Sequence, residues 1–241
     1  MQERTRRGAP GGELPLYVRL SERLIREIAA GHLPDGSRLP PERELAASLG
    51  TSVGTLRKAL ADLARKGLLE RIQGSGNYVR HRPDVASVYS FFRLERLAGG
   101  GLPTAQILSL DSDLPVPEGS GLTGRTGHRI RRLRRLEGEP AAIEEIWLDG
   151  RFATRLDAAA ISESLYLYYR DALDLVIARV EDRVGIDRVP DWSPTDFAPL
   201  PGAASAHVER SSWGAGLDVA EYSRTWFDNE KARYVSRMGK G

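Results

Sequence analysis

The sequence contains no cysteine, which excludes disulfide bonds and thiolate metal sites. Its four histidines, His32, His81, His128 and His207, are scattered along the chain and show no metal-ligand spacing. We therefore expect neither a metal ion nor another cofactor. The chain has no run of 18 apolar residues, and its charged first residues lack the apolar segment of a secretory signal. These absences favour a cytoplasmic protein that does not cross a membrane.

The composition is typical of a globular protein of one or two domains, with 241 residues, 41% of them hydrophobic and 28% charged. The formal net charge of +2 is unevenly distributed. Residues 1–80 carry 14 Lys and Arg against 9 Asp and Glu, a net charge of +5, whereas residues 81–241 carry 21 against 24, a net charge of −3. A basic first third beside an acidic remainder favours a nucleic-acid-binding module joined to a second domain.

Helical periodicity begins after residues 1–13, an Arg- and Gly-rich segment that we expect to be a disordered arm. From Leu16 to Ile28, leucine or isoleucine recurs every four residues, which predicts one amphipathic helix. A second, short helix is predicted to open with Leu39-Pro40-Pro41, because proline is tolerated in a first helical turn, and to end near Gly50.

The third predicted helix has Ser52 as its N-cap and Gly67 as its C-terminal stop. One of its faces is apolar and consists of Val53, Leu56, Leu60 and Leu63. Two short β-like runs follow, residues 68–72 and 77–80, with a flexible tip between them that predicts a hairpin. A helix, a short helix, a tight turn, a third helix and a hairpin form, in this order, a winged helix-turn-helix.

The exposed start of the third helix suits contact with a DNA groove. Gly54 lets the backbone approach DNA, Thr55 can reach a phosphate or a base edge, and Arg57 adds positive charge or guanine readout. Glycines at the hairpin tip can bring the wing near a minor groove. Arg65, Lys66, Glu42 and Glu44 are instead expected to be solvated or to stabilise helix ends. The predicted DNA-binding residues are Arg43, Ser52, Gly54, Thr55, Arg57, Lys58, Arg71, Gln73, Gly74, Ser75 and Gly76.

Three phrases within residues 14–80 resemble the GntR family of bacterial transcription factors. They are LPPERELAASLG at 39–50, TLRKAL at 55–60 and LLERIQGSG at 68–76. The resemblance implies that Arg43, Ser52, Thr55, Arg57 and the wing glycines contact an operator. Val53 stands where many members of the family have an arginine that reads a guanine.

After a linker predicted at residues 81–88, the pattern is that of an α+β domain over residues 89–238. Glu139-Pro140 and Gly214-Ala215-Gly216 mark hairpin turns, and one helix is expected to start near Ser162. The predicted strands are Arg129–Leu136, Ala141–Leu148, Leu175–Val184, His207–Trp213 and Val219–Phe227.

Strand alternation places charged side chains on otherwise apolar faces of this domain. Arg132 and Arg134 fall on such a face of one strand, and Glu144 and Glu221 on those of two others. Buried charges are costly unless they are paired or bind something polar. Arginines facing acids would suit a ligand with an anionic group and with hydroxyl or amine groups. Two other interpretations are internal salt bridges between strands and, for the arginine-rich run 129–135, a second DNA-contact surface.

Four segments resemble the UTRA domain of the HutC-type branch of the same family, which is similar in fold to chorismate lyase. They are Ser90–Arg93, Arg132–Glu144, Ser164–Tyr166 and Glu221–Phe227. The resemblance implies a mainly antiparallel sheet that binds a small effector, sometimes a sugar phosphate, and also forms a dimer. The effector-binding residues that it implies are Ser90, Phe91, Phe92, Arg93, Arg132, Arg134, Glu144, Ser164, Tyr166, Glu221 and Phe227.

We therefore expect a ligand-responsive regulator: a homodimeric repressor that a small anionic metabolite releases from a palindromic double-stranded DNA operator. The linker at 81–88 leads from the wing to the effector segment, and we expect it to couple the two domains. Two alternatives stay open. One is an enzyme with a lyase-like C-terminal domain, although the sequence shows no nucleophile–base pair. The other is a constitutive DNA-binding protein whose C-terminal domain only dimerises.

Overall fold

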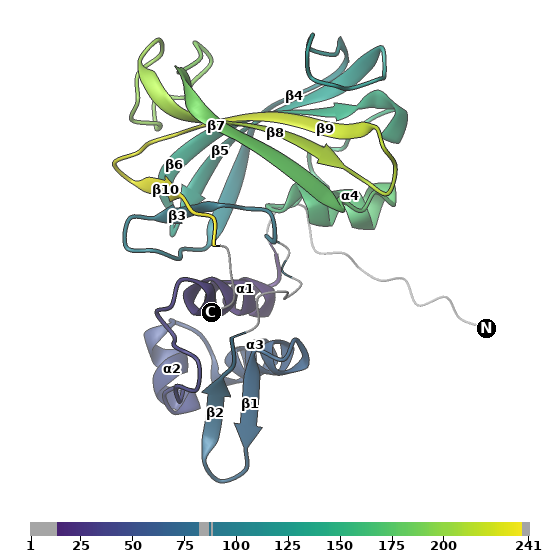
Figure 1. Ribbon diagram of the computed structural model, residues 1–241. Coiled ribbons are helices and arrows are strands. Elements are labelled where there is room, and N and C mark those ends of the chain that lie inside the picture. Colours follow the sequence, from purple (N-terminus) through teal and green to yellow (C-terminus); the bar gives the residue numbers. More distant parts are fainter. Residues whose placement is uncertain (1–13, 82–86, 88, 238–241) are drawn as a thin grey trace, which may run out of the picture.

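The computed structural model describes residues 14–81, 87 and 89–237, which form two parts joined in sequence order (Figure 1). The predicted arm at 1–13 and most of the predicted linker at 81–88 lie outside the described residues. The first part, which we call the head, contains α1 (Leu16–Ala29), α2 (Glu42–Ser48), α3 (Val53–Arg65), β1 (Leu69–Ile72) and β2 (Gly76–Val79).

The apolar faces predicted for the first and third helices meet in the core of the head. Leu56 of α3 is fully buried and belongs to one cluster with Leu24 and Ile28 of α1. Ser52 caps α3 as predicted, because its hydroxyl accepts a hydrogen bond from the Thr55 backbone N–H. With β1 and β2 paired antiparallel, this order of elements confirms the predicted winged helix-turn-helix.

The second part, which we call the body, is built on a six-stranded antiparallel sheet in the order β4-β5-β6-β9-β8-β7. Its strands are β4 (Pro103–Pro115), β5 (Thr126–Leu136), β6 (Glu139–Asp149), β7 (Arg179–Arg188), β8 (Ala204–Trp213) and β9 (Val219–Phe227). The remaining elements are β3 (Leu94–Arg96), η1 (Gly150–Phe152), α4 (Leu165–Leu173) and β10 (Ala232–Tyr234). The helices of the described residues are too short or too polar to cross a membrane.

The face of the sheet nearer the head is covered by α4 and by the small sheet of β3 and β10 (Figure 1). Tyr169 of α4 packs with Ile130 and Ile146 of the sheet, and Leu94 of β3 packs with Leu136. The body is therefore α+β with a mainly antiparallel sheet, as the sequence predicts.

Four features of the body differ from the sequence prediction. The long strand β4 was not expected, because bulges within it interrupt the alternation of side chains. The strand predicted from Leu175 begins only at Arg179, since Leu175 and Ile177 are buried in the cluster around α4 instead. α4 begins at Leu165, with Ser164 as its N-cap, rather than near Ser162. The short strands β3 and β10 were also not predicted.

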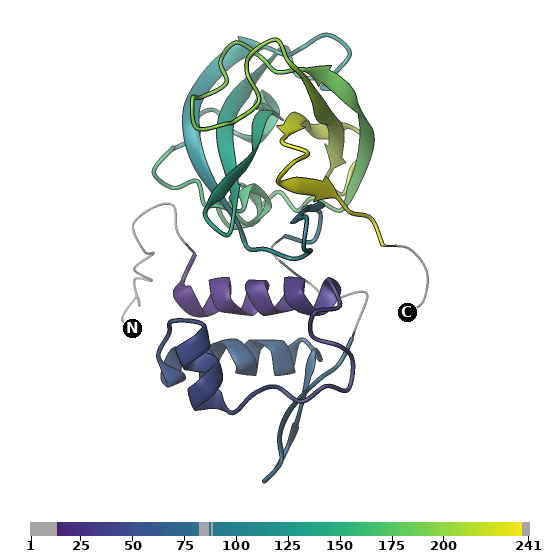
Figure 2. The ribbon, with the colours of Figure 1, turned by 90° about the vertical axis from the view of Figure 1, so that its left-hand side faces the viewer.

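Helix α1 lies between α3 and the body (Figure 2). Its Arg26 is buried, and the guanidinium donates from Nε to the Gly101 carbonyl and from Nη2 to the Leu94 carbonyl. The same guanidinium lies over the ring of Phe92, 5.2 Å from the ring centroid. α1 therefore forms part of the core of the head and also contacts the body.

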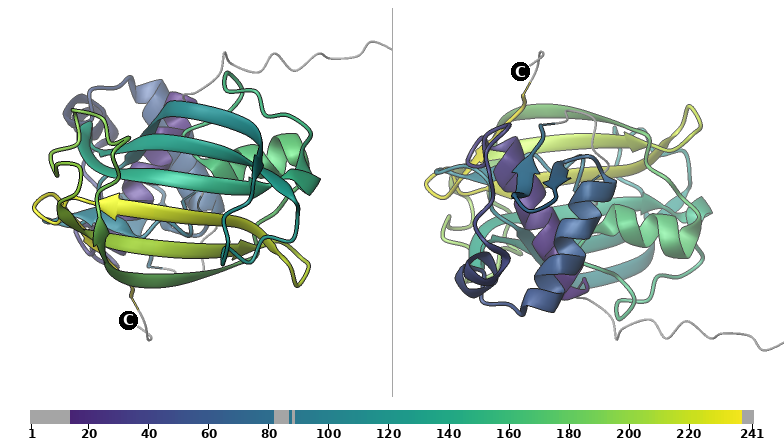
Figure 3. Two further views of the ribbon diagram at one scale, coloured as in Figure 1. Left: turned by 90° about the horizontal axis from the view of Figure 1, so that it is seen from above. Right: turned by 90° about the horizontal axis from the view of Figure 1, so that it is seen from below.

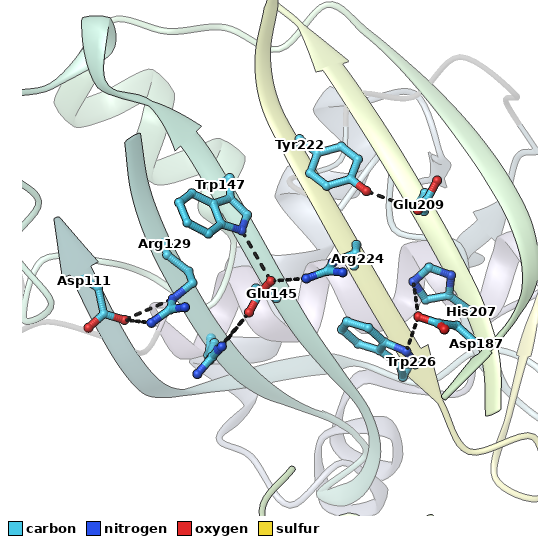
Figure 4. A network of polar contacts seen from close by, with 11 residues as sticks. Asp111, Arg129, Glu145, Trp147, Asp187, His207, Glu209, Tyr222, Arg224 and Trp226 are labelled. Carbon is cyan, nitrogen blue, oxygen red and sulfur yellow. Dashed lines mark hydrogen bonds and ion pairs between the residues drawn. The ribbon is translucent and has the colours of Figure 1, made fainter. Parts of the chain in front are cut away.

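The opposite face of the sheet, seen from above in Figure 3 (left), carries a network of charged and aromatic side chains (Figure 4). Glu145 lies at its centre and accepts hydrogen bonds from Arg131 Nε at 2.9 Å and Arg224 Nη2 at 2.5 Å. Burial alone would raise the pKa of Glu145, but the hydrogen bonds from Arg224 and Arg131 and their charges lower it below its ordinary value.

Each arginine of the run 129–135 has an acidic partner within the body. The pairs are Arg129 with Asp111, Arg131 with Glu145, Arg132 and Arg134 with Glu144, and Arg135 with Asp196. These pairs favour a structural role in the sheet over the interpretation of this run as a second DNA-contact surface.

We expect Glu145→Gln to lower the free energy of unfolding at neutral pH by about 1–3 kcal/mol, because hydrogen bonds to a charged group become bonds to a neutral one. Since folding lowers the pKa of Glu145, its stabilisation is present above the ordinary glutamate pKa and is lost as the pH falls through the folded value. Denaturant unfolding between neutral pH and about pH 3 should therefore show parent and variant converging. A difference that stays constant over this range would contradict the assignment.

Candidate nucleic-acid interface and ligand pocket

The predicted DNA-binding residues lie on α2, on the first turns of α3 and on the wing formed by β1 and β2. Eight are exposed, namely Arg43, Ser52, Gly54, Arg57, Lys58, Arg71, Gln73 and Gly74. Thr55, Ser75 and Gly76 are half-buried. A groove lined by residues 38–42 and 71–77 separates the start of α2 from the wing. The three elements therefore present their polar side chains to solvent beside one groove.

Glu42 connects the third helix to the wing, a role that the sequence did not indicate. Its carboxylate accepts a hydrogen bond from Arg57 Nε at 2.6 Å and lies 4.0 Å from Arg71 Nη2. The sequence predicted only that Glu42 stabilises the start of its own helix. Its partner Arg57 is 15 residues away along the chain, so no local pattern could have indicated the pair. Glu42 orients two predicted DNA contacts and lowers the local positive charge.

A pocket lies on the face of the sheet nearer the head, between β5, β6, β8, β9, the start of α4 and the segment that precedes β3. Its lining residues are Tyr89, Phe91, Phe92, Arg93, Leu94, Arg132, Arg134, Glu144, Ile146, Ser164, Leu165, Tyr166, Val208, Arg210, Glu221, Ser223, Thr225 and Tyr234.

All but two of the predicted effector-binding residues line this pocket; the two are Ser90 and Phe227. Ser90 is exposed, and its hydroxyl donates to the backbone carbonyl of Ser87. Phe227 lies on the face of β9 expected from strand alternation, but at the end of the strand, where it packs with Leu94 and Leu136. Strand alternation gives the face on which a side chain lies but not its depth along the sheet.

Two buried arginines of the pocket share one carboxylate oxygen. Oε2 of Glu144 accepts from Arg132 Nη2 at 2.7 Å and from Arg134 Nε at 2.9 Å. Burial would raise the pKa of Glu144, but the charges of Arg132 and Arg134 lower it, so the carboxylate stays ionised. Nη1 of Arg134 donates further to the backbone carbonyl of Glu163 at 2.9 Å.

Arg132 retains hydrogen-bonding capacity. Within the described part of the chain, its Nε and Nη1 atoms are buried without a hydrogen-bond partner. Burial lowers the pKa of Arg132, Arg134 lowers it further, and Glu144 opposes both effects. Two guanidinium groups share the carboxylate of Glu144, and the charge of Glu221 also acts on Arg132. An anionic group at this position would satisfy the two unpartnered N–H groups of Arg132.

The other side of the pocket is formed by hydroxyl groups around Glu221. Its Oε1 atom accepts from the Tyr166 hydroxyl at 3.0 Å and from the Ser212 hydroxyl at 3.2 Å. Burial raises the pKa of Glu221 above its ordinary value, and the hydrogen bond from Tyr166 only partly opposes this. The pocket thus has the two arginines on one side and Glu221 with the Tyr166 hydroxyl on another.

Arg210 is a lining residue that the sequence analysis missed. It forms a bidentate pair with Asp182, with distances of 2.6 Å from both Nε and Nη2. The sequence indicates the turn at Gly214–Gly216, which joins β8 to β9. The register of these two strands places Arg210 opposite Ser223. Locating Arg210 required the register of that hairpin, which the sequence alternation does not give.

Comparison with known proteins gives matches over both parts. Residues 16–79 match the family model of bacterial regulatory proteins of the gntR family, and residues 103–233 match the UTRA domain. The chain is 53% identical to the HTH-type transcriptional regulator SmoD of Agrobacterium fabrum, over 95% of the chain and 98% of that protein. It is 28% identical to the mannosyl-D-glycerate transport/metabolism system repressor MngR of Escherichia coli, over 93% and 96%.

The fold also resembles the crystal structure of the possible transcriptional regulator YydK of Bacillus subtilis. The TM-score is 0.54 at 20% identity, over 94% of this chain and all of that one. At this identity the likeness concerns the fold alone.

We expect Arg57→Ala to weaken binding to a DNA duplex selected in vitro by the parent protein by about 1–3 kcal/mol, because a phosphate or base contact is lost. The matched control is Arg65→Ala, at the far end of the same helix, where the arginine pairs with Asp62. Fluorescence anisotropy at fixed salt measures both. Equal losses in the two folded variants, or none for Arg57→Ala, would contradict the assignment.

The pocket can be tested by thermal unfolding with a panel of phosphorylated and carboxylated metabolites. A ligand at 100 times its Kd stabilises the folded protein by about 2.7 kcal/mol, which raises the Tm by roughly 5–10 °C. We expect Arg132→Met to abolish this rise, because methionine lacks the unpaired N–H groups of Arg132. Arg131→Met, on the opposite face of the sheet, should retain it. If Arg132→Met keeps the rise, the ligand is bound elsewhere.

Proposed function

The chain belongs to the gntR family of bacterial regulatory proteins and carries a UTRA domain, and on this basis we propose that it is a homodimeric, cytoplasmic repressor that a small anionic metabolite releases from DNA. Its membership makes it a ligand-responsive transcriptional regulator with a DNA-binding head. The observation that carries the proposed ligand class is the buried Arg132, whose two unpartnered N–H groups lie beside a second arginine and a single carboxylate.

The hydroxyl-rich side of the pocket supports a polyhydroxylated metabolite with one acidic group. Glu221 and the Tyr166 hydroxyl, which line the pocket, can exchange hydrogen bonds with sugar hydroxyls, while Arg132 binds the anion. The relative MngR is named as the repressor of a system for mannosyl-D-glycerate, a sugar derivative with a carboxylate, which fits the same chemistry.

Sensing rather than turnover fits the side chains of the pocket. Among the described residues that line it there is no histidine and no cysteine, and its acids Glu144 and Glu221 are engaged by arginines or hydroxyl groups. A general base needs a pKa near neutrality and access to the proton that it removes. Glu144, with a lowered pKa and two guanidinium partners, has neither property.

The aromatic ring of Phe92 lies between the pocket and the head. The Arg134 guanidinium lies 5.1 Å from the centroid of the Phe92 ring, and the Arg26 guanidinium of α1 lies 5.2 Å from the same centroid. Arg134 also holds Glu144, the acid that it shares with Arg132. A ligand that displaces Arg134 therefore changes the contact that seats α1 on the body. The linker expected to couple the domains lies mostly outside the described residues.

Release from DNA follows from the geometry of a two-fold dimer. The two third helices of a dimer must match half-sites about 34 Å apart on a palindromic operator. A shift of α1, which shares a core with α3, would change the separation of these helices. The expected coupling between ligand and operator binding is about 1–3 kcal/mol.

We expect Phe92→Leu to separate sensing from release. Leucine keeps an apolar side chain at this pocket-lining position but removes both cation–π contacts, so even a saturating concentration of ligand should no longer weaken operator binding. The matched control is Phe91→Leu, because Phe91 contacts Tyr166 in the pocket but has no ring contact with Arg26. Operator affinity is measured with and without a metabolite that raises the parent's Tm. If Phe92→Leu releases DNA with the same ligand dependence as the parent, Phe92 does not couple the two sites.

A further inference from the structure

Strand β7 is an open edge of the large sheet. It pairs with β8 on one side, and no strand within residues 14–81, 87 and 89–237 pairs with its other side. Figure 3 (left) shows β7 as the outermost green strand. It is ten residues long, and its Val184 and Ile186 side chains are 56% and 79% exposed. Long edge strands with exposed apolar side chains invite pairing with another chain, and proteins normally protect them.

The sequence of this edge is complementary to itself in the antiparallel direction. Residues 182–188 read Asp-Arg-Val-Gly-Ile-Asp-Arg. When two copies pair with Gly185 opposite Gly185, Val184 of each copy lies opposite Ile186 of the other, and Arg183 lies opposite Asp187. The nearest registers in which the outward backbone groups of both copies still face each other are shifted by two residues. Centred on Val184, the pair places Glu181 opposite Asp187, and like charges directly opposite destabilise a sheet. Centred on Ile186, it places Val184 opposite Arg188, so only the register centred on Gly185 has both the apolar pair and the charge pairs.

The backbone of β7 is oriented for this register. The Val189 N–H donates to the Ala203 carbonyl of the neighbouring segment, so by alternation Gly185 and Asp187 direct their N–H and C=O groups toward β8. Val184 and Ile186 then direct theirs toward the open side, where they can form a hydrogen-bonded pair across the two-fold axis. Gly185 falls on the axis as a non-hydrogen-bonded pair, in which the two Cα atoms approach most closely.

We propose that β7 pairs antiparallel with β7 of a second copy of this chain, centred on Gly185, so that two six-stranded sheets join into one. This proposal rests on the homodimer of the proposed function and assigns its interface. The partner is a second copy because the apolar pair and the two charge pairs all complement each other under a two-fold axis. β7 also carries Asp182, the partner of the pocket residue Arg210, so the interface adjoins the ligand pocket.

Cross-linking tests the register directly, because the chain has no cysteine of its own. In Gly185→Cys the two thiols of a dimer would meet across a non-hydrogen-bonded pair, where the separation suits a disulfide. A side chain at this position meets no atom within 4 Å, so the variant should fold. We expect dilute, oxidised Gly185→Cys to run as a covalent dimer on a non-reducing gel. The control Leu217→Cys, at a position 97% exposed in the turn before β9, should stay largely monomeric on that gel.

A charge variant gives a second, independent readout. Arg183→Asp places two carboxylates opposite each other at both ends of the pair, and we expect it to raise the Kd of the dimer on the order of tenfold. Arg125→Asp, an exposed arginine in the loop before β5, makes the same change of charge and should leave the Kd unchanged. Analytical ultracentrifugation of the full chain measures both variants.

The outcomes separate this proposal from the proposed function. A parent protein that sediments as a dimer, with no cross-link in Gly185→Cys and an unchanged Kd in Arg183→Asp, would overturn the β7 interface and leave the homodimer standing on another face. A parent that sediments as a monomer while binding its operator would overturn the homodimer as well. Cross-linking of Gly185→Cys together with weakening by Arg183→Asp supports the interface.

Discussion

Two buried arginines that share one carboxylate oxygen are the interaction on which the body depends. Arg132 and Arg134 leave β5 on the same face and meet Glu144 from β6, so the cluster joins neighbouring strands in the middle of the sheet. Burying charged groups costs several kcal/mol each unless their partners are nearly complete. Here they are incomplete, because Arg132 keeps two buried N–H groups without a partner in the described part of the chain. In the proposed function, a bound anion completes these partners.

The same cluster lies next to the contact between body and head. Arg134 reaches Phe92, and Phe92 in turn supports Arg26 of α1, whose guanidinium also binds two carbonyls of the body. α1 cannot move without changing the core of the head, because it packs against α3 through Leu24 and Ile28. In the proposed function, ligand charge, helix position and DNA contact are linked through these adjacent groups. An interface at β7 would add the second copy to this arrangement, since Asp182 of β7 holds a pocket arginine.

The head could be predicted from the sequence almost completely, because its signals are local. Four-residue periodicity identifies its helices, and Ser52 identifies a helix start through a hydrogen bond that spans three residues. The faces of β5, β6 and β9 were predictable for the same reason, which is why Arg132, Arg134 and Glu144 were placed together. What failed depends on position along a strand or on distant pairing. Phe227 has the correct face but the wrong depth, and the bulges of β4 remove the alternation that would reveal it. Arg210 and the partnership of Glu42 with Arg57 require registers and contacts that no short segment contains.

The central claim is that an anionic metabolite held by Arg132 controls the affinity for DNA. Its most direct test is mass spectrometry of the small molecules released on denaturing the purified parent protein and the Arg132→Met variant. We expect the parent to release an anionic metabolite that is absent from the variant, and we expect this compound, when added back, to weaken operator binding by the parent. Recovery of the same compound in equal amounts from both proteins, or an operator affinity that the compound leaves unchanged, would contradict the claim.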